Sequence, residues 1–74
     1  MNQKNKEPLT KKQKEILDFL TVFIQKKGYA PALEEVKKEF KLSAISTVWY
    51  YFNEFEKKGY IVRKKYRPRY IQLI

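Results

Sequence analysis

The sequence contains no cysteine and no histidine. Their absence excludes disulfides, thiolate nucleophiles, the usual zinc-ligand sets and the general base that enzymes use most often. The sequence also shows no paired carboxylates for acid–base chemistry and no glycine loop that would cradle a phosphate. We therefore expect no catalytic residues, no metal site and no cofactor, and we do not expect an enzyme.

Long apolar runs are missing as well. The most apolar stretch, residues 16–24, is nine residues long and includes Asp18 and Thr21, so it is far shorter than a membrane span. The polar start of the chain, MNQKNKEP, lacks the apolar core of a signal peptide. We expect a soluble cytoplasmic protein that does not enter a membrane and has one small core.

Acidic residues are absent from one end of the chain. The full sequence has 17 Lys and Arg against 8 Asp and Glu, which gives a formal net charge of +9. Residues 57–74 carry +7 and contain no acid, whereas residues 1–56 carry only +2. A basic end on a nearly neutral body favours a directed contact with an anionic partner, such as a nucleic-acid backbone or a membrane surface. A solvated surface that aids solubility is the alternative.

Apolar residues at helical spacing predict three helices, which comprise about residues 11–27, 32–40 and 44–58. Thr10 and Gln13 form a capping-box pattern at the start of the first helix. Gly28 and Gly59 supply the left-handed stops after the first and third helices.

After Gly59 the apolar period changes from 3.6 to 2, which predicts two strands of a hairpin within about residues 60–74. Residues 66–68 are expected to form its turn, where Pro68 is tolerated. Residues 1–8 are expected to be a disordered lead. The order of helix, helix, turn, helix and hairpin predicts an α+β fold over residues 9–74, a three-helix winged helix-turn-helix in which the basic hairpin is the wing.

A run of four aromatic residues begins at Trp49. With about 100° between successive residues of a helix, Phe52 falls on the core face and Tyr51 on its edge. Tyr50 falls on the opposite, outward face, and Trp49 lies on a flank. Three roles are open for Trp49 and Tyr50, namely contact with DNA, packing against the hairpin or the N-terminal segment, and a surface for a protein partner or self-association.

Four segments together resemble the DNA-binding domain of the LexA repressor family. They are residues 9–17 (LTKKQKEIL), 28–31 (GYAP), 42–48 (LSAISTV) and 56–61 (EKKGYI). The resemblance implies a repressor of a prokaryote or a phage, associated with the nucleoid, that recognises an operator half-site and usually acts as a dimer on a palindrome. In LexA proteins, dimerisation and self-cleavage reside in a following serine–lysine peptidase domain. The sequence ends at Ile74, so we expect either an excised domain or a stand-alone relative, and self-cleavage is not assigned to it.

The chain departs from the family's pattern at the starts of two helices. Ala32 and Ala44 stand where capping residues are usual, and the loss of such a cap costs about 1 kcal/mol. Ser43 is the alternative cap for the third helix. Trp49 and Tyr50 stand where polar or charged residues are usual, so the operator sequence of the family cannot be carried over.

The residues predicted to contact double-stranded DNA form three groups. The amino end of the first helix would bind phosphate through free amides and charge. The third helix would face the major groove, with Ser43 in the preceding turn as a further DNA contact, and the hairpin would cross phosphates or enter the minor groove. The three groups are Thr10 and Lys11; Ser43, Ser46, Thr47, Trp49, Tyr50 and Asn53; and Lys64, Lys65, Arg67 and Arg69.

Asn53 is the best candidate for a bidentate adenine contact, unless its position two turns into the helix leaves it at the backbone. A different class of function, a protein-interaction module that uses Trp49 and Tyr50, is favoured by these aromatics and disfavoured by the basic end. Single-stranded nucleic acid bound by ring stacking is a third alternative.

Overall fold

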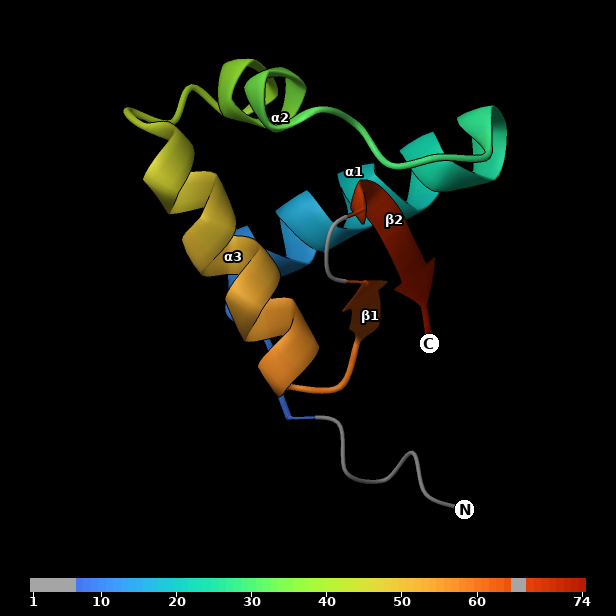
Figure 1. Cartoon of the computed structure of the whole chain (residues 1–74). Coiled ribbons are helices and arrows are strands. Elements are labelled where there is room, and N and C mark those ends of the chain that lie inside the picture. The colour runs from blue at the N-terminus through green and yellow to red at the C-terminus, as the bar shows by residue number, and fades with distance from the viewer. Residues whose placement is uncertain (1–6, 65–66) are drawn as a thin grey trace.

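The computed structural model describes residues 7–64 and 67–74, without the side chains of Pro68 and Arg69. Within these residues the chain forms three helices followed by two strands (Figure 1). The elements are α1 (Lys11–Lys27), α2 (Leu33–Glu39), α3 (Ile45–Lys57), β1 (Ile61–Lys64) and β2 (Arg67–Leu73). The predicted α+β arrangement of three helices and a C-terminal hairpin is confirmed.

Helix α1 begins at the capping box that the sequence predicts. The Thr10 hydroxyl accepts a hydrogen bond from the Gln13 amide at 3.1 Å, and the Thr10 amide donates to Gln13 Oε1 at 3.0 Å. At the other end, Gly28 adopts a φ of +82° and donates its amide to the Ile24 carbonyl at 2.8 Å. These contacts satisfy amides and carbonyls that a helix end leaves unpaired.

An alanine precedes both α2 and α3. Ala32 and Ala44 occupy the N-cap positions, and neither helix has a side-chain cap. The prediction that Ser43 caps α3 is wrong, because Ser43 lies one residue before the N-cap. At α2 the Glu35 carboxylate compensates in part, since its Oε1 accepts from the Ala32 amide at 2.6 Å.

The turn between α2 and α3 is held by a left-handed residue that is not glycine. Lys41 has a φ of +53°, and the next amide, of Leu42, donates back to the Lys37 carbonyl at 2.9 Å. Gly59 adopts the same conformation after α3, with a φ of +92°. This geometry ends a helix abruptly, and at Lys41 it costs about 1–2 kcal/mol because a Cβ is present.

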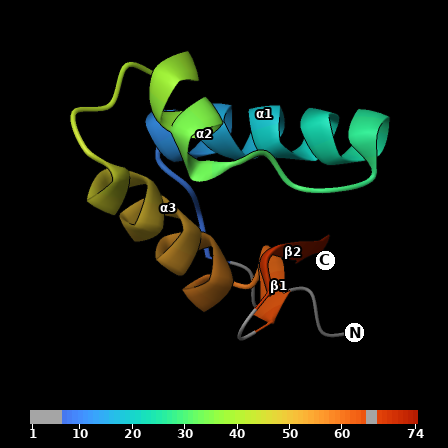
Figure 2. The same cartoon turned by 45° about the horizontal axis from the view of Figure 1, so that its top comes forward.

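The core forms where the apolar faces of the helices meet the hairpin. Phe52 is buried and Tyr51 is half-buried, as the helical projection predicts. The hairpin lies between the C-terminal ends of α3 and α1 (Figures 1 and 2). The buried apolar residues are Ile16, Leu20, Ala30, Val36, Val48, Phe52, Phe55, Ile61 and Ile71.

Strands β1 and β2 pair antiparallel, with Ile61 opposite Leu73 and a register shift after Arg63. The structure differs from the expected turn because β2 already begins at Arg67 and so includes Pro68. A proline is tolerated there because both strands of a two-stranded sheet are edge strands.

The segment before α1 is tied to the far end of α3. The Tyr60 hydroxyl donates to the Glu7 carbonyl at 2.6 Å, and Lys58 Nζ donates to the Pro8 carbonyl at 3.1 Å. Lys58 Nζ also donates to Gln13 Oε1 at 3.0 Å, and Gln13 is only 4% exposed. The expected disordered lead therefore differs from the structure at Glu7 and Pro8, and its residues 1–6 lie outside the described part.

Candidate nucleic-acid interface

One side of α3 faces away from the core. Ser46, Tyr50, Asn53 and Lys57 are exposed along it, and we call these four residues the recognition ridge. Tyr50 is 55% exposed, and its ring meets Tyr51 edge-on with 5.5 Å between centroids. The ridge thus presents hydroxyl, amide and ammonium groups on a helix, the element that fits the DNA major groove.

Trp49 lies on the flank of this ridge beside the hairpin. Its ring meets Phe52 edge-on at 6.5 Å between centroids, and the Arg63 guanidinium carbon lies 5.4 Å from its ring centroid. The indole remains 40% exposed. The packing role that the sequence left open is therefore supported by the contact with Arg63, and the rest of the ring is open to a partner.

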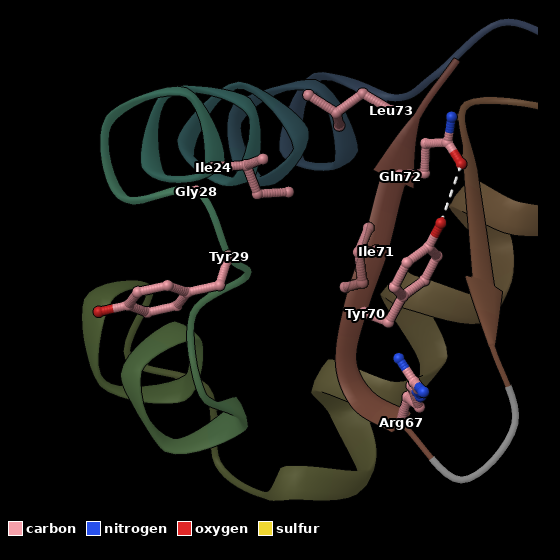
Figure 3. Close-up of a pocket in the computed structure, with 8 residues that line it drawn as sticks. All are labelled: Ile24, Gly28, Tyr29, Arg67, Tyr70, Ile71, Gln72 and Leu73. Atoms are coloured by element: carbon pink, nitrogen blue, oxygen red, sulfur yellow. Dashed lines mark hydrogen bonds between the residues drawn. The ribbon is translucent and has the colours of Figure 1, made fainter.

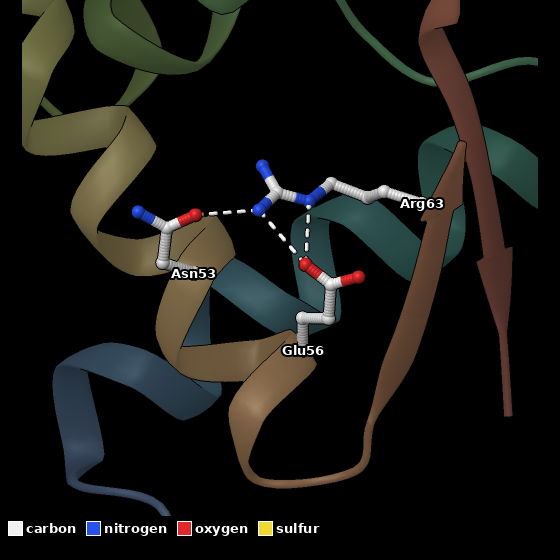
Figure 4. Close-up of polar contacts among 3 residues, drawn as sticks. All are labelled: Asn53, Glu56 and Arg63. Carbon is white, nitrogen blue, oxygen red and sulfur yellow. Dashed lines mark hydrogen bonds and ion pairs between the residues drawn. The ribbon is translucent and has the colours of Figure 1, made fainter. Parts of the chain in front are cut away.

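Arg63 joins strand β1 to the outward side of α3 (Figure 4). Its Nε and Nη2 both donate to Glu56 Oε1, at 3.1 Å and 2.9 Å, and Nη2 also donates to Asn53 Oδ1 at 2.5 Å. The Arg63 side chain is only 18% exposed. We call these three residues the Arg63 bridge, and it places the hairpin beside the recognition ridge.

The predicted set of DNA contacts leaves out Arg63, a wing residue whose strand position can face away from the duplex, and the pattern held a signal for its inward direction. Successive side chains of a strand alternate between its two faces, so Arg63 shares a face with Ile61, which is buried. A strand residue two positions from a core residue points toward the helices, and a long cation there needs a carboxylate or amide partner.

The basic hairpin residues are only partly described. Lys64 is exposed, with its Nζ 5.4 Å from the centroid of the Tyr70 ring, and Arg67 is also exposed. Lys65 lies outside the described residues. Arg69 lies in β2, but its side chain is not described. Lys64 and Arg67 therefore lie near the hairpin tip, which is where the prediction of a basic wing needs them.

The predicted phosphate site at the start of α1 is altered by the capping box. Thr10 and Lys11 are both exposed, but the amides of Thr10 and Gln13 are taken up by each other's side chains. A phosphate here would depend on the remaining first-turn amides and on the Lys11 ammonium.

The turn before α3 completes the predicted set. Ser43 is exposed in this turn, and Thr47 is half-buried one residue after Ser46. The amide of Thr47 donates to the Ala44 carbonyl at 3.1 Å. The structure therefore brings Ser46, Tyr50 and Asn53 onto one ridge and leaves Ser43 and Thr47 at its edge.

A separate apolar cleft of about 730 Å³ lies between the end of α1 and strand β2 (Figure 3). The Tyr70 hydroxyl at its rim donates to Gln72 Oε1 at 3.2 Å. The cleft includes no residue of the recognition ridge. Its lining comprises Ile24, Gly28, Tyr29, Arg67, Tyr70, Ile71, Gln72 and Leu73.

Among the described residues, no group of acidic side chains is placed to hold a metal ion. Over the same residues, no helix is both long and apolar enough to cross a membrane.

A short second helix, a tight turn and a third helix with an outward polar ridge, flanked by a basic hairpin, define a winged helix-turn-helix domain. Comparison with known proteins identifies the family within this class. The chain belongs to the LexA DNA-binding domain family, whose family model matches residues 6–70. The family resemblance drawn from the sequence is thereby confirmed, and the family is one of DNA-binding domains of repressors.

Three similar proteins are LexA repressors. The chain is 45% identical over 69 residues to a LexA repressor of Caldicellulosiruptor saccharolyticus, which covers 93% of the chain and 34% of that protein. It is 41% identical over 68 residues to LexA repressors of Bacillus mycoides and Bacillus thuringiensis, covering 92% of the chain and 33% of each. The chain thus spans about a third of the length of these curated relatives.

Proposed function

We propose that the chain binds double-stranded DNA sequence-specifically, as the DNA-binding domain of a LexA-like transcriptional repressor. One observation carries this proposal. The Arg63 bridge fastens the hairpin to the side of α3 on which Tyr50 is exposed, so α3 and the hairpin can touch one duplex together. Membership in the family supports the same function.

In this proposal the recognition ridge enters the major groove. Ser46, Tyr50 and Asn53 face base edges there, and Thr47 lies beside them. Trp49 packs on sugar or a thymine methyl group with the part of its ring that Arg63 leaves open.

Phosphates are held at both sides of the ridge. Lys64 and Arg67 of the hairpin contact phosphates or the minor groove, together with Lys65 and Arg69, and Ser43, Thr10 and Lys11 add contacts at the other side. About five neutralised phosphates per half-site would make log K fall with log salt at a slope of about −4 to −5.

Fluorescence anisotropy with a labelled random-sequence duplex at low salt tests the proposal. A saturable signal that salt removes is expected. The absence of saturable binding would contradict the proposal and favour a protein-interaction module that uses Trp49 and Tyr50, the two exposed aromatic residues of α3. Competition by single-stranded DNA of the same length separates duplex binding from ring stacking.

We further propose that two copies act on a palindromic operator in the cytoplasm of a prokaryote or a phage-infected cell, where the nucleoid offers the duplex. Selection of bound sites from a random duplex pool tests this. Two inverted half-sites with centres one helical turn apart, about 10 base pairs, or a multiple of it, are expected for a dimer. A single isolated half-site would contradict dimeric binding.

A further inference from the structure

We propose that Arg63 sets the base preference of Asn53, because it fixes the Asn53 amide with its hydrogen-bond donor, Nδ2, toward the duplex. Asn53 then favours acceptors without a neighbouring donor, either the guanine edge or a phosphate oxygen, over the adenine edge, where the N6 amino donor lies beside N7. This inference rests on the proposed function and names the chemistry that one residue of the recognition ridge reads.

The orientation of the amide follows from the chemistry of its partner. A guanidinium carries only donors, so the atom of Asn53 that faces Arg63 Nη2 has to be the acceptor, Oδ1. Rotating the amide by 180° would set N–H against N–H beside a positive charge. Figure 4 shows Nδ2 on the side of the amide that points away from Arg63.

Arg63 can impose this orientation because it is itself held by two other residues of α3. Glu56 Oε1 accepts from both Nε and Nη2, and the Trp49 ring lies 5.4 Å from the guanidinium carbon. Trp49, Asn53 and Glu56 are spaced four and three residues apart, so they form one stripe of α3. With 18% of its side chain exposed, Arg63 acts through Asn53 and is a positioning residue.

The fixed orientation of the Asn53 amide determines which base edge the amide fits. A bidentate adenine contact needs Oδ1 to accept from N6 while Nδ2 donates to N7. Here Oδ1 already accepts from a cation, and the guanidinium charge opposes the approach of the adenine amino group. Guanine presents acceptors at both O6 and N7, so it suits the outward donor Nδ2 and the nearby positive charge.

Sites selected from a random duplex pool by the wild type, N53A and R63M provide the test. The wild type is expected to prefer guanine over adenine at one position of its half-site, by about 5- to 100-fold. N53A loses this preference. R63M keeps the aliphatic stem but frees the amide, so its preference shifts toward adenine.

K64A is the matched control. It removes a positive charge from the same strand, but Lys64 Nζ lies over the Tyr70 ring and not at Asn53. K64A is expected to weaken binding while leaving the base profile unchanged. If R63M does not fold, R63K serves instead, because it keeps the charge without the fork that bridges Asn53 and Glu56, and its discrimination also falls.

Two kinds of modified duplex separate the sources of the acceptor. If the acceptor is the base, replacing the preferred guanine by 7-deazaguanine, which lacks N7, or by 2-aminopurine, which lacks O6, weakens binding by the wild type but not by N53A. If the acceptor is a phosphate oxygen, replacing that one phosphate by a methylphosphonate weakens binding by the wild type but not by N53A. R63M is then expected to be as insensitive to this replacement as N53A. Either pattern supports an outward donor held by Arg63.

The proposal is overturned if the wild type prefers adenine at the position that N53A alters. It is overturned if the Arg63 variants keep both the base preference and the sensitivity to modified duplexes of the wild type. It is also overturned if N53A changes neither the base preference nor this sensitivity. These results all require binding, so they differ from failure of the proposed function, in which the wild type itself does not bind duplex DNA.

Discussion

At the scale of single residues, Trp49 shows how one side chain serves both the fold and the exposed surface. Its ring contacts Phe52 at one edge and Arg63 over its face, and part of it still meets solvent. An aromatic ring under a guanidinium gains cation–π attraction of about 0.5–1 kcal/mol at an exposed site. Trp49 thus holds the hairpin while remaining a candidate DNA contact.

Because Trp49 is the only tryptophan in the sequence, its fluorescence reports on this site alone. We expect duplex DNA at low salt to quench or shift its emission, since bound DNA would exclude water from the exposed part of the ring. A fluorescence titration checks this, and added salt should restore the free spectrum. An unchanged spectrum under conditions where anisotropy saturates would place the DNA elsewhere.

Lys41 carries the strain of the turn between α2 and α3, with its φ of +53°. We expect K41G to raise the free energy of unfolding by about 0.5–1 kcal/mol, because glycine accepts this conformation without a Cβ penalty. Urea unfolding measures the change. K41A is the control, since it removes the charge but keeps a Cβ, and a gain in K41A equal to that in K41G would contradict the strain argument.

At the scale of elements, the ends of the helices are where sequence reasoning worked best and also where it failed. Thr10, Gly28 and Gly59 act as predicted because capping depends on neighbours in the chain. The Ser43 cap failed because α3 begins one residue later than that cap requires, with Ala44 at the N-cap. A left-handed lysine has no clear signature in a sequence, since most left-handed stops are glycine.

Contacts between elements were much harder to predict. The Arg63 bridge depends on how β1 lies against α3, and the link from Gln13 to Lys58 joins residues 45 positions apart. Helical and strand periodicity give the inward and outward faces of each element, but they do not give the angle between elements. The recognition ridge and the inward direction of Arg63 were therefore predictable, but the partners of Arg63 on α3 were not.

The link between α1 and α3 gives a prediction for stability. Gln13 is buried, and its Oε1 accepts from both the Thr10 amide and Lys58 Nζ. We expect Q13A to lower the free energy of unfolding by about 1–3 kcal/mol, because the part-buried Thr10 amide loses its acceptor and Lys58 Nζ keeps only the Pro8 carbonyl. Thermal or urea unfolding checks this against Q25A, an exposed glutamine of the same helix. Equal effects of the two substitutions would show that the link contributes nothing.

At the scale of the whole molecule, the distribution of charge and the position of the hairpin both favour the proposed contact with DNA. The excess positive charge lies in residues 57–74, and the hairpin that carries much of it is fastened beside the recognition ridge. Within this basic segment Lys58 and Arg63 are engaged in contacts with the fold, to Gln13 and Glu56 respectively. Of the remaining cations we expect Lys64, Lys65, Arg67 and Arg69 to meet phosphates, so the net charge overstates the number of DNA contacts.

The salt dependence of duplex affinity tests the central claim most directly. It is measured for the wild type, K64A/R67A and Y50A, each on a selected site and on a random duplex. We predict a wild-type slope of log K against log salt of about −4 to −5, flattened by about 2 in K64A/R67A, whose preference for the selected site is kept. Y50A should keep the slope and lose preference. Unchanged slope and preference in both variants would contradict the claim that the ridge reads sequence while the hairpin holds the backbone.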